Sequence, residues 1–434
     1  MKLNMFYAGF FLLLAVGCKK ESDLPSTTNG TGKLILVKGG NQSGVFGELL
    51  PDTIILKLTS SHASDHFSVT YSLLQGNGQV EQNGYSVNRP IQKDSAGTLA
   101  INWRMGCNNT VQKLRFYIYT DSSNYYFYGV PSDSITITAN AVKPNGWCRS
   151  CGYTTTDFLF SKVIADNDVL YLVDAGLLSS TDGGLNWYKI NGIPYSDEIM
   201  NAQFNSNHWA YVLTKEHGIY FSKDMKQWEA INTGLLDMRD PTAFLVEDTA
   251  LFVSFYFDGP YRTINNGNFW KKLIVGSGTQ RVNYIRRHPD GRLMLFDDWQ
   301  DFKISADNGD TWQPAPLSSK YVNYEVYDFK IATDGKLYIG SGNATLAILD
   351  PYTYEGEVHT YYQWNASLQI INNITITGNN VYYLVNYNPV PGIYAENNGW
   401  NLLNVGFNTP FNYYYLKQNG QFLIGSQGWL YYHD

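Results

Sequence analysis

The sequence predicts an all-β protein in which an N-terminal β-sandwich precedes a seven-bladed β-propeller. Aromatic residues make up 15% of the 434 residues and charged residues only 16%, a balance that favours pleated sheets. Tryptophans recur at a nearly constant spacing after residue 145, and short apolar runs alternate with Asp-Gly or Asn-Gly turns. The length alone indicates two or more domains.

The first 32 residues have the composition of an export signal and a tether. An apolar run over 5–16 is too short to span a membrane, and it leads through Gly17 into Cys18. The ending Leu-Ala-Val-Gly-Cys resembles a bacterial lipobox. The resemblance implies a signal peptide at 1–17, lipidation of Cys18 and a flexible tether at 18–32; the alternative is an ordinary signal peptide with a chance cysteine. The charged stretch after Cys18 resembles surface-export tags, so we expect a surface-exposed outer-membrane lipoprotein.

Residues 33–142 contain short strand-like runs separated by glycine-containing turns, a pattern typical of a β-sandwich. The runs lie at 33–37, 53–58, 67–73, 98–104, 113–119 and 134–139. The segments GGNQSG and AGTLAINWRMG resemble bacterial Ig-like domains of the invasin-related type. This resemblance implies a spacer that holds a second domain away from the membrane. We expect Trp103 in the core, because its strand alternates apolar and polar residues.

From residue 145 to 434 the tryptophans mark a repeat of about 40 residues. The separations between successive members are 40, 41, 42, 42, 52 and 36 residues. The members are Trp147, Trp187, Trp228, Trp270, Trp312, Trp364 and Trp400.

Each repeat contains a strand, a tight turn, a second strand, a loop, a third strand and a turn that ends at tryptophan. Four strands in about 40 residues is the size of a propeller blade. After Trp400 only 34 residues remain, which leaves the last unit one strand short. Because the segment near Trp147 resembles the one before Trp400, we expect it to pair with the C-terminal strand and close a ring of seven blades.

The turns before two of the tryptophans share the pattern S-x-D-x-G-x-x-W. The pattern resembles the Asp-box, or BNR repeat, of sialidases, Asp-box xyloglucanases, sortilin-type receptors and photosystem-assembly propellers. The aspartate can accept backbone N–H groups, glycine permits positive φ and tryptophan covers the hairpin, so we expect a structural role. In the resembling families these turns lie away from the ligand site. The residues are Ser180, Asp182, Gly184 and Trp187, and Ser305, Asp307, Gly309 and Trp312.

We expect ligand contacts on the opposite face, in the loops that join second to third strands and neighbouring blades. Trp299 stands outside the tryptophan repeat in an acidic loop, where an aromatic ring beside carboxylates suits a sugar. The alternative is that Trp299 plugs the channel or packs against the next blade. The candidate residues are Trp299, Asp297, Asp298, Asp301, Tyr256, Asp258, Arg239 and Tyr387.

Glycoside hydrolysis would need two carboxylates at a defined separation, one with a raised pKa, and a sequence cannot measure that separation. A sialidase would also carry an early arginine motif, of which the sequence around Arg239 is a poor imitation. We therefore expect no sialidase, and catalytic residues stay unassigned.

The remaining chemistry is sparse. Cys148 and Cys151 form an isolated C-x-x-C, for which a local disulfide, or a bond from one of them to Cys107, is a better explanation than zinc. The seven histidines have no metal-binding spacing, so we predict neither metal nor cofactor.

The net charge of −7 and the lack of a basic cluster beyond Arg286-Arg287 argue against nucleic-acid binding. We expect a monomer that contacts the membrane through its lipid alone and binds a glycan or an envelope or host protein without covalent chemistry. The alternatives are a glycoside hydrolase of the Asp-box propeller type and an envelope assembly or scaffold factor.

Overall fold

The computed structural model describes residues 32–60, 67–87, 90–107, 109–120, 131–143, 147–150, 162–174, 176–276, 281–321, 325–360, 370–377, 380–386, 392–395, 401–402, 413–416, 422–426 and 429–433. The expected signal peptide, Cys18 and the tether up to residue 31 lie outside them. The described elements are strands and one 3₁₀ turn, η1 (Ser196–Glu198), so the predicted all-β class is confirmed. The described residues contain no helix long and apolar enough to cross a membrane.

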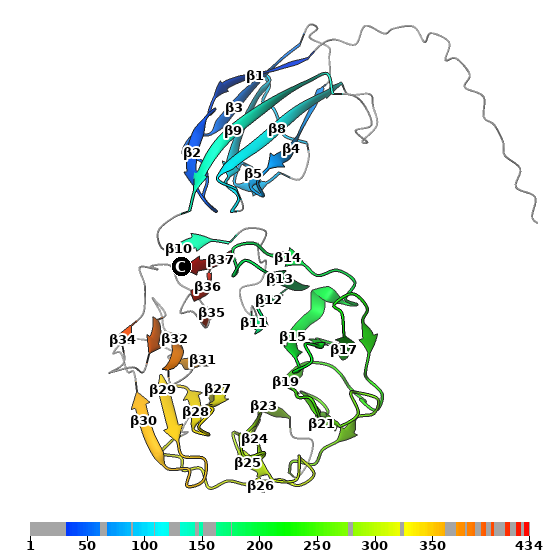
Figure 1. Ribbon diagram of the computed structural model, residues 1–434, viewed down its shortest axis with the longest axis vertical. Helices are drawn as coiled ribbons and strands as arrows, with labels where there is room; N and C mark the ends of the chain where they lie inside the picture. The colour runs from blue at the N-terminus through cyan, green and yellow to red at the C-terminus, as the bar shows by residue number, and fades with distance from the viewer. Residues whose placement is uncertain are drawn as a thin grey trace, which may run out of the picture.

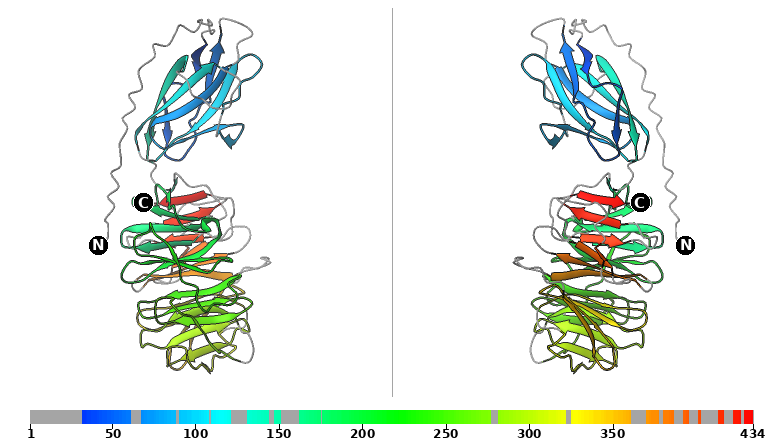
Figure 2. Two further views of the ribbon diagram at one scale, coloured as in Figure 1. Left: turned by 90° about the vertical axis from the view of Figure 1, so that its right-hand side faces the viewer. Right: turned by 90° about the vertical axis from the view of Figure 1, so that its left-hand side faces the viewer.

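The N-terminal strands form two sheets around one core, drawn in blue and cyan in Figures 1 and 2. The first sheet, in spatial order, contains β1 (Lys33–Lys38), β3 (Ile54–Thr59), β7 (Thr98–Arg104), β5 (Gln79–Gln82) and β6 (Tyr85–Ser86). The second contains β2 (Gln42–Val45), β9 (Asp133–Val142), β8 (Val111–Thr120) and β4 (Phe67–Gln75). Burial alternates along β7, which turns Leu99 and Trp103 into the core cluster that also contains Phe116 of β8. Trp103 is 1% exposed, which confirms the prediction for this residue.

The rest of the described chain forms seven four-stranded antiparallel sheets around a common axis, in the arrangement of a β-propeller (Figure 1). Three of these sheets contain β11 (Lys162–Asp166), β12 (Val169–Asp174), β13 (Gly176–Ser180) and β14 (Tyr188–Lys189); β15 (Ile199–Phe204), β16 (Ala210–Thr214), β17 (Ile219–Ser222) and β18 (Glu229–Ala230); and β19 (Pro241–Val246), β20 (Leu251–Phe255), β21 (Gly259–Thr263) and β22 (Lys271–Lys272).

The next three sheets contain β23 (Val282–Arg287), β24 (Leu293–Asp297), β25 (Phe302–Ser305) and β26 (Gln313–Pro314); β27 (Val326–Ile331), β28 (Leu337–Ser341), β29 (Thr345–Leu349) and β30 (Gly356–Thr360); and β31 (Ile370–Thr377), β32 (Asn380–Asn386), β33 (Gly392–Ala395) and β34 (Asn401–Leu402). The last sheet joins β10 (Trp147–Arg149) to β37 (Trp429–His433), β36 (Phe422–Ser426) and β35 (Tyr413–Leu416).

The position of a strand within its sheet determines its composition. The second strands β16, β20, β24 and β28 are buried along their whole length, because sheets pack on both of their faces. They therefore read as continuous apolar runs such as AYVLT and LMLFD. The outermost strands β18, β22 and β26 are exposed and pair over two residues only.

Side chains of the innermost strands bond each sheet to the next around the axis. These bonds run from Lys162 Nζ to Asn201 Oδ1 (2.9 Å), Gln203 Nε2 to Phe244 O (2.8 Å), Thr242 Oγ1 to Val282 O (2.6 Å), Arg286 Nε to Phe329 O (3.2 Å), Ile374 N to Asp328 Oδ2 (2.7 Å) and Asn373 Nδ2 to Tyr414 O (2.7 Å). β11 and β35 also contact each other, so the first and last sheets are neighbours.

The strand that follows the N-terminal sheets belongs to the last sheet of the chain. Trp147 pairs with His433 and Arg149 with Tyr431 in an antiparallel ladder. Cys107 of the N-terminal part is disulfide-bonded, and its sulfur lies 3.4 Å from the carbonyl oxygen of Arg149. A bond from Cys107 is one of the two expected pairings; the alternative, a Cys148–Cys151 bridge, lies outside the described side chains.

Candidate functional site

The Asp turns, residues 180–187 and 305–312, are closed by their own hydrogen bonds. Asp307 Oδ1 accepts from Thr311 N at 2.9 Å and from Ser305 Oγ at 2.7 Å, while Ser305 Oγ accepts from Gly309 N at 2.7 Å. The hydroxyl of Thr311, its backbone N–H and Ser305 hold the pKa of Asp307 well below its usual range. Trp312 Nε1 donates to Gly309 O at 3.1 Å.

The upstream copy repeats this pattern. Asp182 accepts from Ser180 Oγ at 2.8 Å and from Asn186 N at 2.9 Å, and Trp187 Nε1 donates to Gly184 O at 2.9 Å. In the weaker copy before Trp270, Asn265 Oδ1 takes the aspartate's place and accepts from Phe269 N at 3.1 Å. These contacts support a structural role for the Asp turns.

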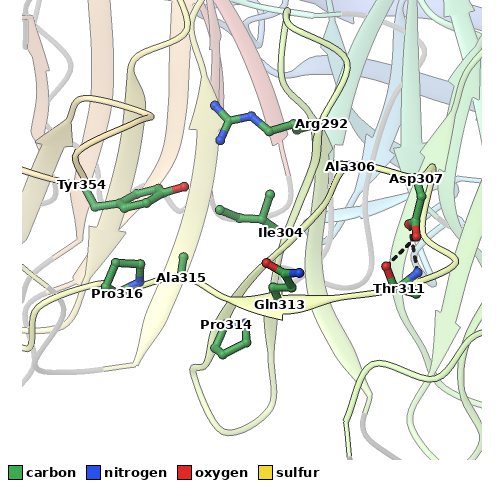
Figure 3. A pocket seen from close by; sticks show the side chains of 10 residues that line it. All are labelled: Arg292, Ile304, Ala306, Asp307, Thr311, Gln313, Pro314, Ala315, Pro316 and Tyr354. Atoms are coloured by element: carbon green, nitrogen blue, oxygen red, sulfur yellow. Dashed lines mark hydrogen bonds between the residues drawn. The ribbon is translucent and has the colours of Figure 1, made fainter.

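A pocket of about 450 Å³ lies beside Asp307, between two neighbouring sheets (Figure 3). Its charged groups are engaged elsewhere: Asp307 with Thr311, and Arg292 Nε with Asp290 Oδ2 at 2.8 Å. A groove of about 370 Å³ lies at the same place beside Asp224, two sheets earlier. The recurrence indicates that stacked sheets leave this gap, so we assign it no ligand.

The loop face lies at the other end of the same strands. It comprises the segments 195–198, 236–240 and 281 that lead into β15, β19 and β23, and the turns 215–218, 256–258 and 298–301 that join second to third strands. Backbone hydrogen bonds connect these loops, from Asp240 N to Lys215 O (3.0 Å), Tyr256 N to Asp240 O (2.9 Å) and Asp298 N to Arg281 O (3.2 Å).

Two arginines and two aromatic rings form a layered cluster on the loop face. The guanidinium of Arg281 lies 4.2 Å from the ring centre of Tyr256, and that of Arg239 lies 4.9 Å from Phe257. The two rings are 4.9 Å apart and half exposed. Asp237 pairs with both Nε and Nη2 of Arg239, at 2.9 and 2.6 Å, which lowers the pKa of Asp237 to about 2. The cluster is held in place while its faces stay accessible.

Trp299 projects from the neighbouring turn with 73% of its surface exposed, so packing against the next blade does not account for it. The turn is organised by Asp297, which is fully buried and accepts from Trp299 N and Asp301 N, each at 3.0 Å. Lys303 pairs with the second oxygen of Asp297. Asp297 therefore orients Trp299 and has no exposed surface for a ligand.

The other predicted acidic residues differ in accessibility. Asp301 is exposed, whereas Asp298 is partly buried, and its Oδ1 has no hydrogen-bond partner in the described part of the chain. Asp258 is buried and bonded to Lys272 and Tyr261; burial acts to raise its pKa, but these two bonds outweigh burial and lower it. Tyr387 lies outside the described residues.

Sequence reasoning placed Phe257, Tyr195 and His217 in the loops of this face without singling them out. It gave no role to Arg281 and did not predict the stack of Tyr195 on His217. That stack has ring centres 3.5 Å apart, and His217 Nδ1 lies 2.7 Å from Glu198 Oε2. Arg281 and Tyr195 lie in the segments just before a first strand, as Arg239 does, so alignment of the repeats on that position is the signal that finds them.

This arrangement is suited to binding. A general acid for glycoside hydrolysis would need a raised pKa, and every carboxylate with a perturbed pKa among the described residues is shifted downward, including Asp237, Asp258 and Asp307. No group of three metal-ligating side chains occurs in the described ranges.

Neither a family model nor a curated protein matches the chain. The GH74 xyloglucanase from Xanthomonas campestris resembles it with a TM-score of 0.52 and 11% identity over 66% of this chain and 53% of the xyloglucanase. The extracellular domain of a hybrid two component system from B. thetaiotaomicron matches with a TM-score of 0.51 and 14% identity, over 88% of this chain and 55% of that domain's chain. The extracellular domain of a one component system from the same organism matches with a TM-score of 0.51 and 10% identity, over 90% of this chain and 57% of the other. This chain spans little more than half of each. The similar structures include β-propeller proteins, and at these identities they show the β-propeller fold alone.

Proposed function

We propose that this protein is displayed on the cell surface and binds a partner protein non-covalently through the loop face. The observation that supports binding is the pair of half-exposed rings of Tyr256 and Phe257, each in contact with an arginine, beside the exposed Trp299. Tryptophan, tyrosine and arginine dominate the energy of protein interfaces, because they bury large areas and keep a polar group for the partner.

A protein ligand fits the loop face better than a glycan. A sugar site needs carboxylates that are free to bind hydroxyl groups, but Asp297 and Asp258 are buried and paired with lysines. Asp301 is the exposed acid that remains on the Trp299 turn. The large exposed surface is aromatic and cationic, which suits a partner that offers apolar and acidic side chains.

We also propose that the seven four-stranded sheets are seven blades of one propeller at 145–434, closed by β10, and that 33–142 is an Ig-like spacer. The pairing of β10 with β37 supports closure, because it covers two sheet edges that would otherwise be open. We propose a monomer as well, as the sequence analysis expects.

The proposed anchor is a lipid on Cys18. Radiolabelled palmitate should enter the wild-type chain and not Cys18→Ala, which should leave the membrane fraction. Equal labelling of the two chains would contradict the lipobox interpretation.

The binding role is tested by a photo-crosslinking amino acid at position 299, in cells that display the chain. The matched control is position 188, where Tyr188 is 59% exposed on an outermost strand. We expect a protein crosslink from position 299 and none from 188. No crosslink from 299, or the same products from both, would contradict the proposal.

A glycan array provides the separate test of the sugar alternative, with Trp299→Ala compared with Tyr188→Ala. If the array shows glycan binding that Trp299→Ala abolishes and Tyr188→Ala does not, the ligand is a glycan and not a protein. Release of reducing sugar from polysaccharides would instead indicate a hydrolase.

A further inference from the structure

Three cationic residues lie on the strands that line the axis of the ring, away from the loop-face cluster. Lys162, Arg286 and Lys330 lie on the innermost strands β11, β23 and β27 (Figure 1). The sheets of β11 and β27 are not neighbours in either direction around the ring. Even so, the charges of Lys330, Arg286 and Asp328 act on Lys162, and this interaction is possible only across the axis.

The axis carries an excess of positive charge. Against three cations the group contains one carboxylate, Asp328, whose oxygens already accept from Phe329 N at 2.8 Å and Ile374 N at 2.7 Å. Lys330 Nζ lies 3.7 Å from Asp328 Oδ1. When Lys162 is protonated, two positive charges therefore remain without a counter-charge among the described residues of this group. Gathering like charges in a protein interior is costly unless an anion joins them.

The side chains of Lys162 and Arg286 retain N–H groups that can donate hydrogen bonds to a ligand. Lys162 gives one N–H to Asn201, and the bonds of Arg286 to Phe329 O and Ile285 O use two of its five N–H groups within the described structure. Lys330 keeps 37% of its side chain exposed although protein surrounds it, so solvent reaches the axis. Burial, with help from Lys330 and Arg286, lowers the pKa of Lys162 to about 7, which shows how strongly the site disfavours a further positive charge.

We propose that the axis of the ring is a binding site for an oxyanion, held between Lys162, Arg286 and Lys330. A guanidinium and two ammonium groups are the donors that bind carboxylate and phosphate oxygens most strongly. With Lys162 protonated, the residual charge of about two matches a doubly charged anion, whether a phosphate group or a pair of carboxylates. This site is independent of the loop face, because none of its residues belongs to that surface.

The test titrates the full chain with inorganic phosphate and with succinate, each against chloride at constant ionic strength, while the melting temperature is recorded. One of the two oxyanions should raise the melting temperature saturably, and which one does so identifies the chemistry. In Lys162→Met the anion should bind about tenfold or more weakly, because one charge-assisted hydrogen bond is lost. The same variant should melt at a higher temperature than wild type without anion, since one repelling charge is removed.

Lys189→Met is the matched control, because Lys189 lies on the exposed outer strand of the same sheet as Lys162. It should titrate like the wild type, whereas Lys330→Met, a second axis variant, should lose affinity as Lys162→Met does. The proposal is overturned if neither oxyanion exceeds chloride, or if both axis variants keep the full stabilisation by the anion.

Discussion

The two ends of the strands in one sheet use polar side chains in opposite ways. At one end of β25, the Asp turn directs Ser305 and Asp307 to its own backbone, and Trp312 bonds back to Gly309. At the other end, Asp297 fixes a turn that leaves Trp299 exposed. A motif can therefore be prominent in the sequence because it builds the hairpin, while the surface that we propose for binding lies where the pattern is irregular.

The largest effect should come from a buried tryptophan of the repeat. Trp270 is 1% exposed and donates Nε1–H to Ile231 O at 2.6 Å. Trp270→Ala should lower the free energy of unfolding by roughly 3–5 kcal/mol, because it leaves a cavity and an unpaired carbonyl. Urea unfolding measures the loss, and Trp299→Ala, an exposed tryptophan on the loop face, is the control. Equal losses of unfolding free energy in the two variants would show that the Asp-turn end of the strands contributes no more to stability than the loop face.

A smaller loss is expected from the hydroxyl of the Asp turn. Ser305 is 1% exposed, and Ser305→Ala leaves the Gly309 N–H without its acceptor. The cost should be about 1–3 kcal/mol of unfolding free energy. Ser180→Ala should behave alike, because Ser180 Oγ accepts from Gly184 N at 2.8 Å. A neutral result for both variants would mean that water replaces the hydroxyl and that the turn does not depend on it.

The smallest effect on stability is expected from Asp307→Asn at acidic pH. The pKa of Asp307 lies below its usual 3.8, so its contribution is present above that pH and is lost as the pH falls further. Asp307→Asn imitates the copy in which Asn265 holds the turn, and it should fold like the wild type. Its melting temperature should fall less than that of the wild type between pH 4 and pH 2, as recorded by circular dichroism. A parallel decline in both chains would show that Asp307 adds no acid sensitivity.

The fold was more accessible from sequence than the site. The all-β class and the propeller arrangement follow from a period of about 40 residues and from turn residues whose conformations are local. The loop face depends on neighbours that the sequence does not reveal. Asp297 was predicted as a sugar contact because the sequence does not show that it has a partner. That partner, Lys303, lies on the next strand, and only the pairing of β24 with β25 brings the two together.

Contacts between sheets were the hardest to predict. Arg281 and Tyr256 belong to successive sheets, and no local pattern indicates that one stacks on the other. The electrostatic effect of Lys330 on Lys162 requires the ring itself, because the two strands are far apart along the chain.

We propose that binding and stability reside at opposite ends of the strands, and one paired measurement on Trp299→Ala and Ser305→Ala tests this division. Each variant is melted and then titrated with the protein that crosslinks at position 299. Trp299→Ala should keep its unfolding free energy within about 0.5 kcal/mol of wild type and lose binding by about tenfold or more. Ser305→Ala should lose stability and bind like the wild type at temperatures where it is folded. Retained binding in Trp299→Ala, or lost binding in folded Ser305→Ala, would contradict the account.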